Sequence, residues 1–160
     1  MSAGVLGGLQ SLLCDDGLGV LKGSDIKSFE LPHFEKGVLV WKLIGKDPNF
    51  LGGGEDVDIR EPKCIFYDEK GESHIKASRA LYEGAKKKCT MKGDVFAATN
   101  QGFKFSCAEM EFLMDDKKLV FPGEFHVYGE KLLLKAARGS YDIKTMILQT
   151  EGRTDFNSEP

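Results

Sequence analysis

The sequence carries little excess charge, and the small excess it has is negative. Over 160 residues the formal net charge is −3 and the pI is about 5.7. Nucleic-acid-binding proteins usually present a basic face, so this balance gives no support to a nucleic-acid partner. The length is that of one domain that can bury a substantial core.

Cysteine and histidine are also sparse, and their spacing matches no metal site. The four cysteines include no Cys-x-x-Cys pair, and none of the three histidines stands at zinc spacing. The histidines have no serine or cysteine nucleophile at a recognisable distance. The glycine run 52–54 lacks the Lys-Ser/Thr of a phosphate-binding loop. We therefore expect no catalytic residue, no metal and no cofactor.

No hydrophobic run is long enough to cross a bilayer. Met1–Cys14 is apolar but short, and it lacks the basic start of a secretory signal peptide. The residues that follow are polar and glycine-rich, with no strong period. We predict a poorly ordered leader over 1–36, one domain over 37–156 and a tail over 157–160.

What the sequence does contain is a threefold repeat from Ile75 to Phe156. Its copies are spaced 30 and 29 residues apart, and in each an aromatic residue precedes a glycine by 11 positions. The aromatic–glycine pairs are Tyr82 and Gly93, Phe112 and Gly123, and Tyr141 and Gly152. A fixed period of this size is typical of a stacked architecture, in which no copy can bury its apolar face alone.

Within each copy the apolar residues alternate with polar ones. Cys89, Met91 and Val95 alternate with Thr90, Lys92 and Asp94, and the third copy repeats this pattern over 148–154. Alternation of period two indicates half-buried strands, and the polar segments between them indicate turns. The fold class that we predict is all-β, a stacked-repeat β-jellyroll in which two antiparallel sheets face each other.

The alternation also predicts which side chains face the space between the sheets. This inward set mixes small residues, methionines and aromatics: Ile75, Ala77, Ala80, Met91, Val95, Phe105, Met110, Phe121, Phe125, Leu132, Leu134 and Ala136. In a plain sandwich such side chains interdigitate and fill the core. In a lipid carrier, small and adaptable residues leave room for acyl chains. The pattern alone favours the filled core. We also expect Cys89 and Cys107 at inward positions as buried thiols, with a disulfide as the alternative, and a reactive Cys14 in the leader.

The repeat resembles a known family. Apolar-x-Ala-x-x-small-x-Tyr, followed by apolar-x-apolar-x-Gly-x-Val, is similar to the OstA-like repeat of the lipopolysaccharide-transport proteins LptA and LptC. Upstream, the segments 37–43 (GVLVWKL) and 62–71 resemble the first strand and next hairpin of the LptC-like branch, which we favour. The resemblance covers about residues 34–156.

The resemblance implies a fold and a function. The fold would be a "β-taco", whose two sheets part to hold acyl chains against the inward set. The function would be noncovalent binding and relay of lipopolysaccharide or a similar glycolipid in the periplasm. Implied partners are other OstA-like domains docking at strand edges and an inner-membrane ABC transporter complex. A tether to the inner membrane, through a segment missing from this chain, stays open.

Two further features bear on partners. The lysines of successive turns, Lys86, Lys87, Lys88, Lys117 and Lys118, would gather along one edge. This basic rim would bind lipid phosphates or an anionic partner. The alternative is that the lysines are simply solvated and discourage aggregation at the sheet edge. No further copy of the repeat follows the strand from Leu148 to Phe156. We therefore expect a partner domain to pair with its free edge.

Two rival functions come from other classes of protein. A structural β-solenoid would assemble through its strand edges and carry no lipid. An enzyme on the same scaffold would need a cleft with paired acids, and the carboxylates here fall in turns and at outward strand positions. Lipid relay remains the interpretation we favour.

Overall fold

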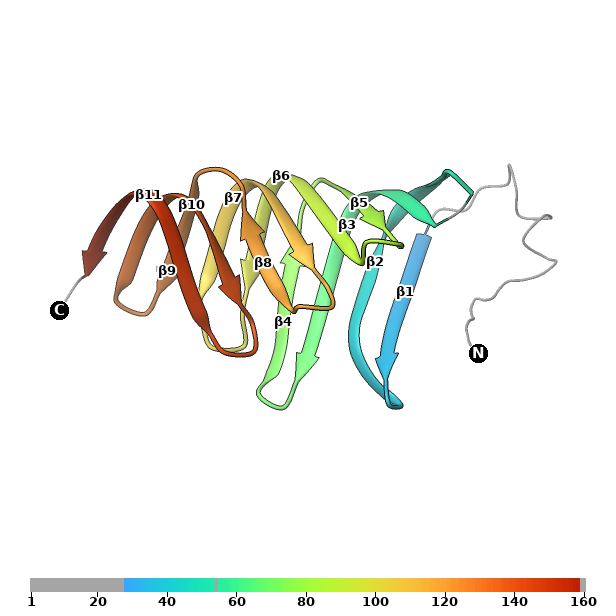
Figure 1. The fold of residues 1–160 in the computed structure, drawn as a ribbon, viewed down its shortest axis with the longest axis horizontal. Coiled ribbons are helices and arrows are strands. Elements are labelled where there is room, and N and C mark those ends of the chain that lie inside the picture. Colours follow the sequence, from blue (N-terminus) through green and yellow to red (C-terminus); the bar gives the residue numbers. More distant parts are fainter. Residues whose placement is uncertain (1–27, 54, 159–160) are drawn as a thin grey trace.

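The computed structural model describes residues 28–53 and 55–158, and throughout this part of the chain the regular structure is β (Figure 1). The strands are β1 (Ser28–Glu35), β2 (Val38–Leu51), β3 (Asp56–Asp68), β4 (Gly71–Lys76), β5 (Arg79–Glu83), β6 (Lys88–Ala98), β7 (Lys104–Leu113), β8 (Lys118–Phe121), β9 (Phe125–Gly129), β10 (Leu132–Asp142) and β11 (Ile147–Ser158). The all-β class predicted from the alternation is confirmed.

All eleven strands belong to one antiparallel sheet. Its order is β1-β2-β3-β4-β6-β7-β8-β10-β11, with β5 beside β3 and β6, and β9 beside β7 and β10. Each strand therefore pairs with near neighbours in the sequence, as short antiparallel connections require. The repeat predicted two facing sheets; here one continuous sheet supplies both faces.

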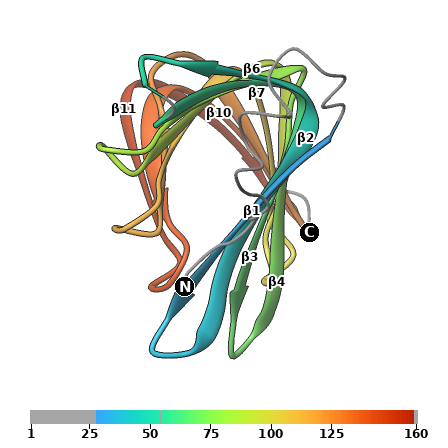
Figure 2. The same cartoon turned by 90° about the vertical axis from the view of Figure 1, so that its right-hand side faces the viewer.

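The sheet presents two faces because its long strands bend. We call the part that pairs with β4 and β9 arm A, and the part that pairs with β5 and β8 arm B. Strand β3 contributes to both, since Cys64 pairs with Ile75 on β4 and Ile59 pairs with Ala80 on β5. Viewed along the stack, the two arms turn toward each other (Figure 2).

The bends coincide with β-bulges. Between Lys92 and Val95 the pairing of β6 with β7 slips, and both intervening residues have positive φ, 85° at Gly93 and 47° at Asp94. Strand β3 turns at Glu61, whose φ is 49°. An extra residue on one strand sharpens the local twist and bends the strand. The repeated glycine therefore marks the crease between the arms.

The inward faces of the two arms form one core. Twenty-four apolar residues are buried there, and the largest that are fully buried include Tyr141, Phe66, Phe105, Phe112, Phe121 and Phe125. Several ring contacts join one arm to the other: Phe66 on arm A lies 6.5 Å edge-on from Phe112 on arm B. These contacts hold the arms face to face.

The first strand lies upstream of the one predicted. The pattern predicts a first strand after Gly37 and a poorly ordered leader over 1–36. In the structure, Ser28–Glu35 of that leader forms β1, which pairs with β2. The alternation of Phe29, Leu31 and His33 was hidden by Pro32, which sits where the edge strand does not need its missing N–H. The rest of the leader, residues 1–27, lies outside the described residues, and the division into leader, domain and tail stays a prediction.

Two segments contain turn-forming residues and yet do not reverse the chain. Residues 46–49 are a bulged part of β2 in which Asp47 has a φ of 47°. Residues 56–68 form one strand, β3, which bends at Glu61 and Pro62. At both places pairing with the neighbouring strands continues on either side of the irregularity. Pro122 lies between β8 and β9, where the strand is interrupted.

We predict that Gly93→Ala destabilises the fold while Gly123→Ala does not, although both glycines hold the same position in the repeat. An added Cβ at Gly93 would lie 2.8 Å from the Ser78 Cβ, on a backbone with a φ of +85°. At Gly123 nothing lies within 4 Å. Strain and steric overlap together should lower the free energy of unfolding by about 1–3 kcal/mol in the first variant. Urea denaturation measures the difference, and equal midpoints for the two variants would contradict this account of the crease.

Candidate functional site

The predicted inward set lies on the concave side of the folded sheet. Cross-strand pairing aligns Ala80, Met91 and Met110 in one row on arm B. On arm A, Phe105 is level with Val127. Apart from Ala77 and Leu132, which are partly buried against the core, every residue of the set is buried. Their placement agrees with the predicted strand parity, whereas a role in lipid binding stays a prediction.

Side chains fill the space between the arms. Phe105 of arm A stacks 5.3 Å from Phe121 of arm B, and Tyr141 of arm B lies 4.9 Å from Phe105. Phe121 in turn stacks 4.2 Å from Phe125 of arm A. In this state the interior is the closely packed core that the pattern alone favoured. A chain-like ligand would have to separate these rings.

One buried polar atom of this interior is left without a well-formed hydrogen bond. The Tyr141 hydroxyl lies on a residue that is 2 % exposed, and among residues 28–53 and 55–158 the nearby Thr99 side chain lowers its pKa slightly but forms no well-aligned hydrogen bond with it. Burial raises the pKa of Tyr141, so the group is a neutral hydroxyl that can donate a hydrogen bond. An unsatisfied buried hydroxyl is unfavourable unless a ligand or water meets it.

An ion pair bridges the free ends of the two arms. Lys117, in the turn before β8 on arm B, places its Nζ 3.2 Å from the carboxylate of Glu35 at the end of β1. The hydrogen bond from Lys117 is the largest influence on Glu35 and lowers its pKa below 4.5. His33 also contacts this carboxylate, and its ring stacks 5.0 Å from Trp41. We call the Glu35–Lys117 contact the mouth pair.

The turns of arm B stack as the repeat predicted. The Met114 N–H donates to the Lys87 carbonyl at 2.9 Å, and the Ile143 N–H donates to the Lys117 carbonyl at 3.0 Å. The lysines of these turns therefore share one rim. Several of their charges are already matched, because Lys86 and Lys88 both contact Glu83 and Lys117 is in the mouth pair. Binding of lipid phosphate or a partner at this rim stays a prediction.

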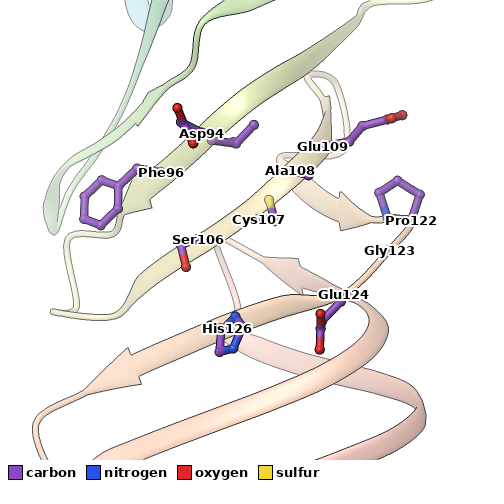
Figure 3. A pocket seen from close by; sticks show the side chains of 11 residues that line it. Asp94, Phe96, Ser106, Cys107, Ala108, Glu109, Pro122, Gly123, Glu124 and His126 are labelled. Atoms are coloured by element: carbon purple, nitrogen blue, oxygen red, sulfur yellow. The ribbon is translucent and has the colours of Figure 1, made fainter.

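A shallow hollow of about 820 Å³ opens on the outward side of the sheet (Figure 3). Its lining comes from residues 94–96 of β6, residues 106–109 of β7, and residues 122–124 with His126 at the start of β9. The hollow therefore lies at the crease, where the pairing of β6 with β7 slips and where β8 ends before β9 begins. Val95 is the one member of the inward set that lines the hollow, and the sequence pattern gave no sign of this feature.

The three cysteines in the described residues are free thiols. Cys64 and Cys89 are fully buried, and Cys107, beside the crease, is only partly buried. Burial raises the pKa of Cys89 to about 12 and that of Cys107 to about 11. Cys89 is therefore buried inward as expected, whereas Cys107 is only partly buried, packing against the core and also lining the hollow at the crease. Cys14, expected to react readily, lies outside the described residues.

Metal and membrane features are absent from residues 28–53 and 55–158. No group of three or more histidine, cysteine or acidic side chains is placed to hold a metal ion. The same residues contain no helix long and apolar enough to cross a membrane.

The fold matches a solved structure of known architecture. The crystal structure of LptH from Pseudomonas aeruginosa superposes with a TM-score of 0.63 at 10 % sequence identity, covering 75 % of this chain and 95 % of LptH. LptH is described as the LptA-homologous periplasmic component of a lipopolysaccharide transport device. No protein-family profile and no curated protein sequence matches this chain.

This likeness confirms the OstA-like fold that the repeat predicted. At this level of identity it concerns the backbone architecture alone. LptH is an LptA homologue, so the comparison gives no support to the LptC-like branch that the upstream segments favoured. That preference stays a prediction.

Several residues at the site were not predicted from the sequence. Tyr141 was recognised as a repeat aromatic but not as an inward polar group, and Glu35 was assigned to a leader. The turn residues Met114 and Ile143 are buried, although their equivalent in the first copy is Gly84. A comparison of the three turns could have identified this position as apolar. Nothing in the sequence indicates that Glu35 meets Lys117.

We predict that Cys107 is modified faster than Cys64 and Cys89. In a Cys14→Ser background, labelling with iodoacetamide followed by peptide mass spectrometry should find Cys107 first. Only the thiolate reacts, and a raised pKa keeps the thiol protonated at neutral pH. The rate at Cys107 should therefore rise about tenfold for each pH unit between pH 7 and 10. Labelling of Cys89 at the same rate as Cys107 would mean that the face assigned as inward is open to solvent.

Proposed function

We propose that this protein binds a glycolipid of the lipopolysaccharide type between its two arms and passes it on within the periplasm. The observation that carries the proposal is the continuous apolar lining of both arms, in a sheet folded like that of a periplasmic lipopolysaccharide-transport component. The transfer involves no bond chemistry. Acyl chains leave one apolar interior and enter the next.

Binding requires the arms to separate and the acyl chains to replace ring-to-ring contacts. Burial of each methylene group is favourable by about 0.8 kcal/mol, so several chains offset the lost contacts between arms. Met91, Met110 and Met114 are all fully buried in this interior. Their unbranched side chains can repack around a ligand more readily than β-branched ones.

The mouth pair offers little resistance to such an opening. The Glu35 side chain is 43 % exposed and that of Lys117 is 14 % exposed. An ion pair near the surface contributes about 0–1 kcal/mol, no more than the burial of one or two methylene groups. Once the pair opens, Lys117 is a cation at the rim that can meet a lipid phosphate.

Tyr141 would give the apolar interior a polar contact. Its hydroxyl can donate a hydrogen bond to an ester or amide carbonyl, or to a hydroxyl group on an acyl chain. Phe103 and Phe105 lie 6.4 and 4.9 Å from its ring, so such a group would be held in an otherwise apolar surrounding. A hydrogen bond formed there would be strong, because no water competes for it.

A partner domain would dock on β11. This strand pairs only with β10 among the described residues, so its other edge is open. The Gln149 carbonyl oxygen lies close against Gly139 of β10. Because alternate residues of a strand direct their main-chain groups to opposite sides, those of Thr150 face the open edge. A strand of a second OstA-like domain could pair there.

A structural scaffold remains the alternative function. The observation in its favour is that both ends of the described sheet, β1 and β11, have one open edge each. Edge pairing alone would then assemble the chain without any lipid. Lipid content distinguishes the two functions: glycolipid should co-purify from a lipopolysaccharide-producing host and be detected by mass spectrometry, whereas a scaffold would carry none.

We predict that a photo-crosslinking residue at Phe105 captures glycolipid while the same residue at Lys92 does not. Phe105 is 1 % exposed and lies between the arms, whereas Lys92 is exposed on the outer side. Crosslinked lipid is measured by mass spectrometry after expression in a lipopolysaccharide-producing host. Equal capture at both positions would rule out the interior as the lipid site.

The same experiment tests the mouth pair through Glu35→Gln, with Glu72→Gln as a control. Glu72 forms an ion pair with His74 on the outer side, away from the mouth pair. Loss of the mouth pair should speed capture at Phe105 about two- to fivefold, as removal of about 0.5–1 kcal/mol implies. In the parent protein the lowered pKa of Glu35 keeps the carboxylate charged and the pair intact at neutral pH, and the pair is lost as the pH falls through that lowered pKa. Capture by the parent should therefore accelerate only at acidic pH.

We predict that Thr150→Pro abolishes partner docking at β11 and leaves the fold intact. Proline removes the N–H that faces the open edge, and the side chain it replaces is exposed. Thr150→Val keeps the N–H and serves as the matched control. Pull-down from periplasm, with bound proteins identified by mass spectrometry, should recover an OstA-like partner with the control alone. Full recovery with the proline variant, at an unchanged melting temperature, would place docking elsewhere.

A further inference from the structure

The outer face of arm A has an unusual distribution of charge for an acidic protein. Cross-strand register defines two neighbouring rows on this face. One runs from Ile44 on β2 through Lys63 and Lys76 to Lys135 on β10. The neighbouring row runs from Lys42 on β2 through Lys104 on β7 to Leu133 on β10.

Neither row holds a carboxylate between β2 and β10. In the first row carboxylates stand only at the outermost strands, with Glu30 on β1 and Asp155 on β11. The protein as a whole has 25 acidic and 22 basic residues. Five lysines and no carboxylate in these two rows therefore mark a local concentration of positive charge. We call the two rows between β2 and β10 the basic face.

The lysines at the centre of the basic face lack partners. Lys42 and Lys135, near the ends, contact Glu30 and Glu124. Within residues 28–53 and 55–158, Lys63, Lys76 and Lys104 form no ion pair. Their positive charges are therefore free to meet an external anion.

Two of these lysines are placed against each other. Lys63 on β3 is directly opposite Lys76 on β4. Like charges in such a cross-strand pair repel, and the arrangement lowers the stability of the sheet. An arrangement of two lysines that lowers the stability of the sheet is expected where both charges are needed to bind an anionic partner.

Apolar and aromatic groups lie among the lysines. The Lys76 Nζ stands 5.7 Å from the centre of the Phe96 ring, and Tyr128 is directly opposite Lys104. Tyr128 and Leu133, which are neighbours in register, are 40 % and 43 % exposed. Phe96, Ser106 and His126 of the first row also line the hollow, whose other lining residues include Asp94, Glu109 and Glu124 (Figure 3). Exposed rings and aliphatic groups beside lysines are suited to the headgroup region of a bilayer, where each has a favourable environment.

We propose that the basic face docks this protein on the surface of an anionic phospholipid bilayer. The lysines attract the negative surface potential, and Tyr128 with Leu133 reaches into the headgroup layer. An acidic protein would also match the charge, but it would leave the exposed ring and leucine without a clear role. This docking is independent of lipid binding between the arms, because its residues point away from the interior.

The test is co-sedimentation of the full chain with vesicles. One set contains phosphatidylcholine alone, and the other contains phosphatidylcholine with phosphatidylglycerol. We expect binding to the anionic vesicles only, with affinity falling as salt is raised. Lys63→Gln/Lys76→Gln/Lys104→Gln should weaken that binding at least tenfold, and Tyr128→Ala should weaken it by a smaller factor.

The control removes the same charge from exposed lysines that belong neither to the basic face nor to the turns of arm B. Lys36→Gln/Lys70→Gln/Lys92→Gln changes the net charge equally and should bind within twofold of the parent. Lys63→Gln alone should leave the melting temperature unchanged or raise it, because it relieves the repulsion with Lys76. The proposal is overturned if the parent fails to bind anionic vesicles, if both vesicle types bind equally, or if the two triple variants lose the same affinity. The proposal is likewise overturned if the unsubstituted protein binds an acidic protein but no vesicle.

Discussion

Continuous strand pairing through a bend is the constraint on which this structure depends. A flat antiparallel sheet of eleven strands would leave a broad apolar face in water. Here the long strands bend at bulges, so that the apolar faces of arm A and arm B are turned toward each other. Pairing with neighbours continues on both sides of the bulge, and the sheet buries its own face. No helix or second sheet covers it within residues 28–53 and 55–158.

The same constraint explains why one architecture suits both a plain core and a ligand-binding interior. The arms are joined along the crease by main-chain bonds, such as that from the Ser78 N–H to the Gly93 carbonyl at 2.8 Å. At their free ends they are joined mainly by side chains, among them the mouth pair. The opening that the proposed function requires would break these side-chain contacts and leave the main-chain bonds of the crease intact.

The outer and inner faces are specialised in different ways. Inward positions are apolar almost without exception, because they lie between the arms. Outward positions are in water and face no packing requirement, so their composition reflects other demands. On arm A those positions carry lysines and exposed rings, including the unfavourable Lys63–Lys76 pair. The alternation of each strand thus separates a surface for the interior from a surface for the surroundings.

The sequence alone determined the strand content, the repeat and the parity of the inward residues. Period-two alternation has one structural meaning, and three copies in register specify which residues face inward. The sequence alone could not determine that one sheet makes both faces, because the bulges at Glu61 and Gly93 depend on the register of pairing with the neighbouring strands β2 and β7. Nor could it place Glu35 beside Lys117, 82 residues away. The basic face, too, exists only through register across strands β2 to β10. Such contacts arise where the chain folds back on itself, and local patterns carry no record of them.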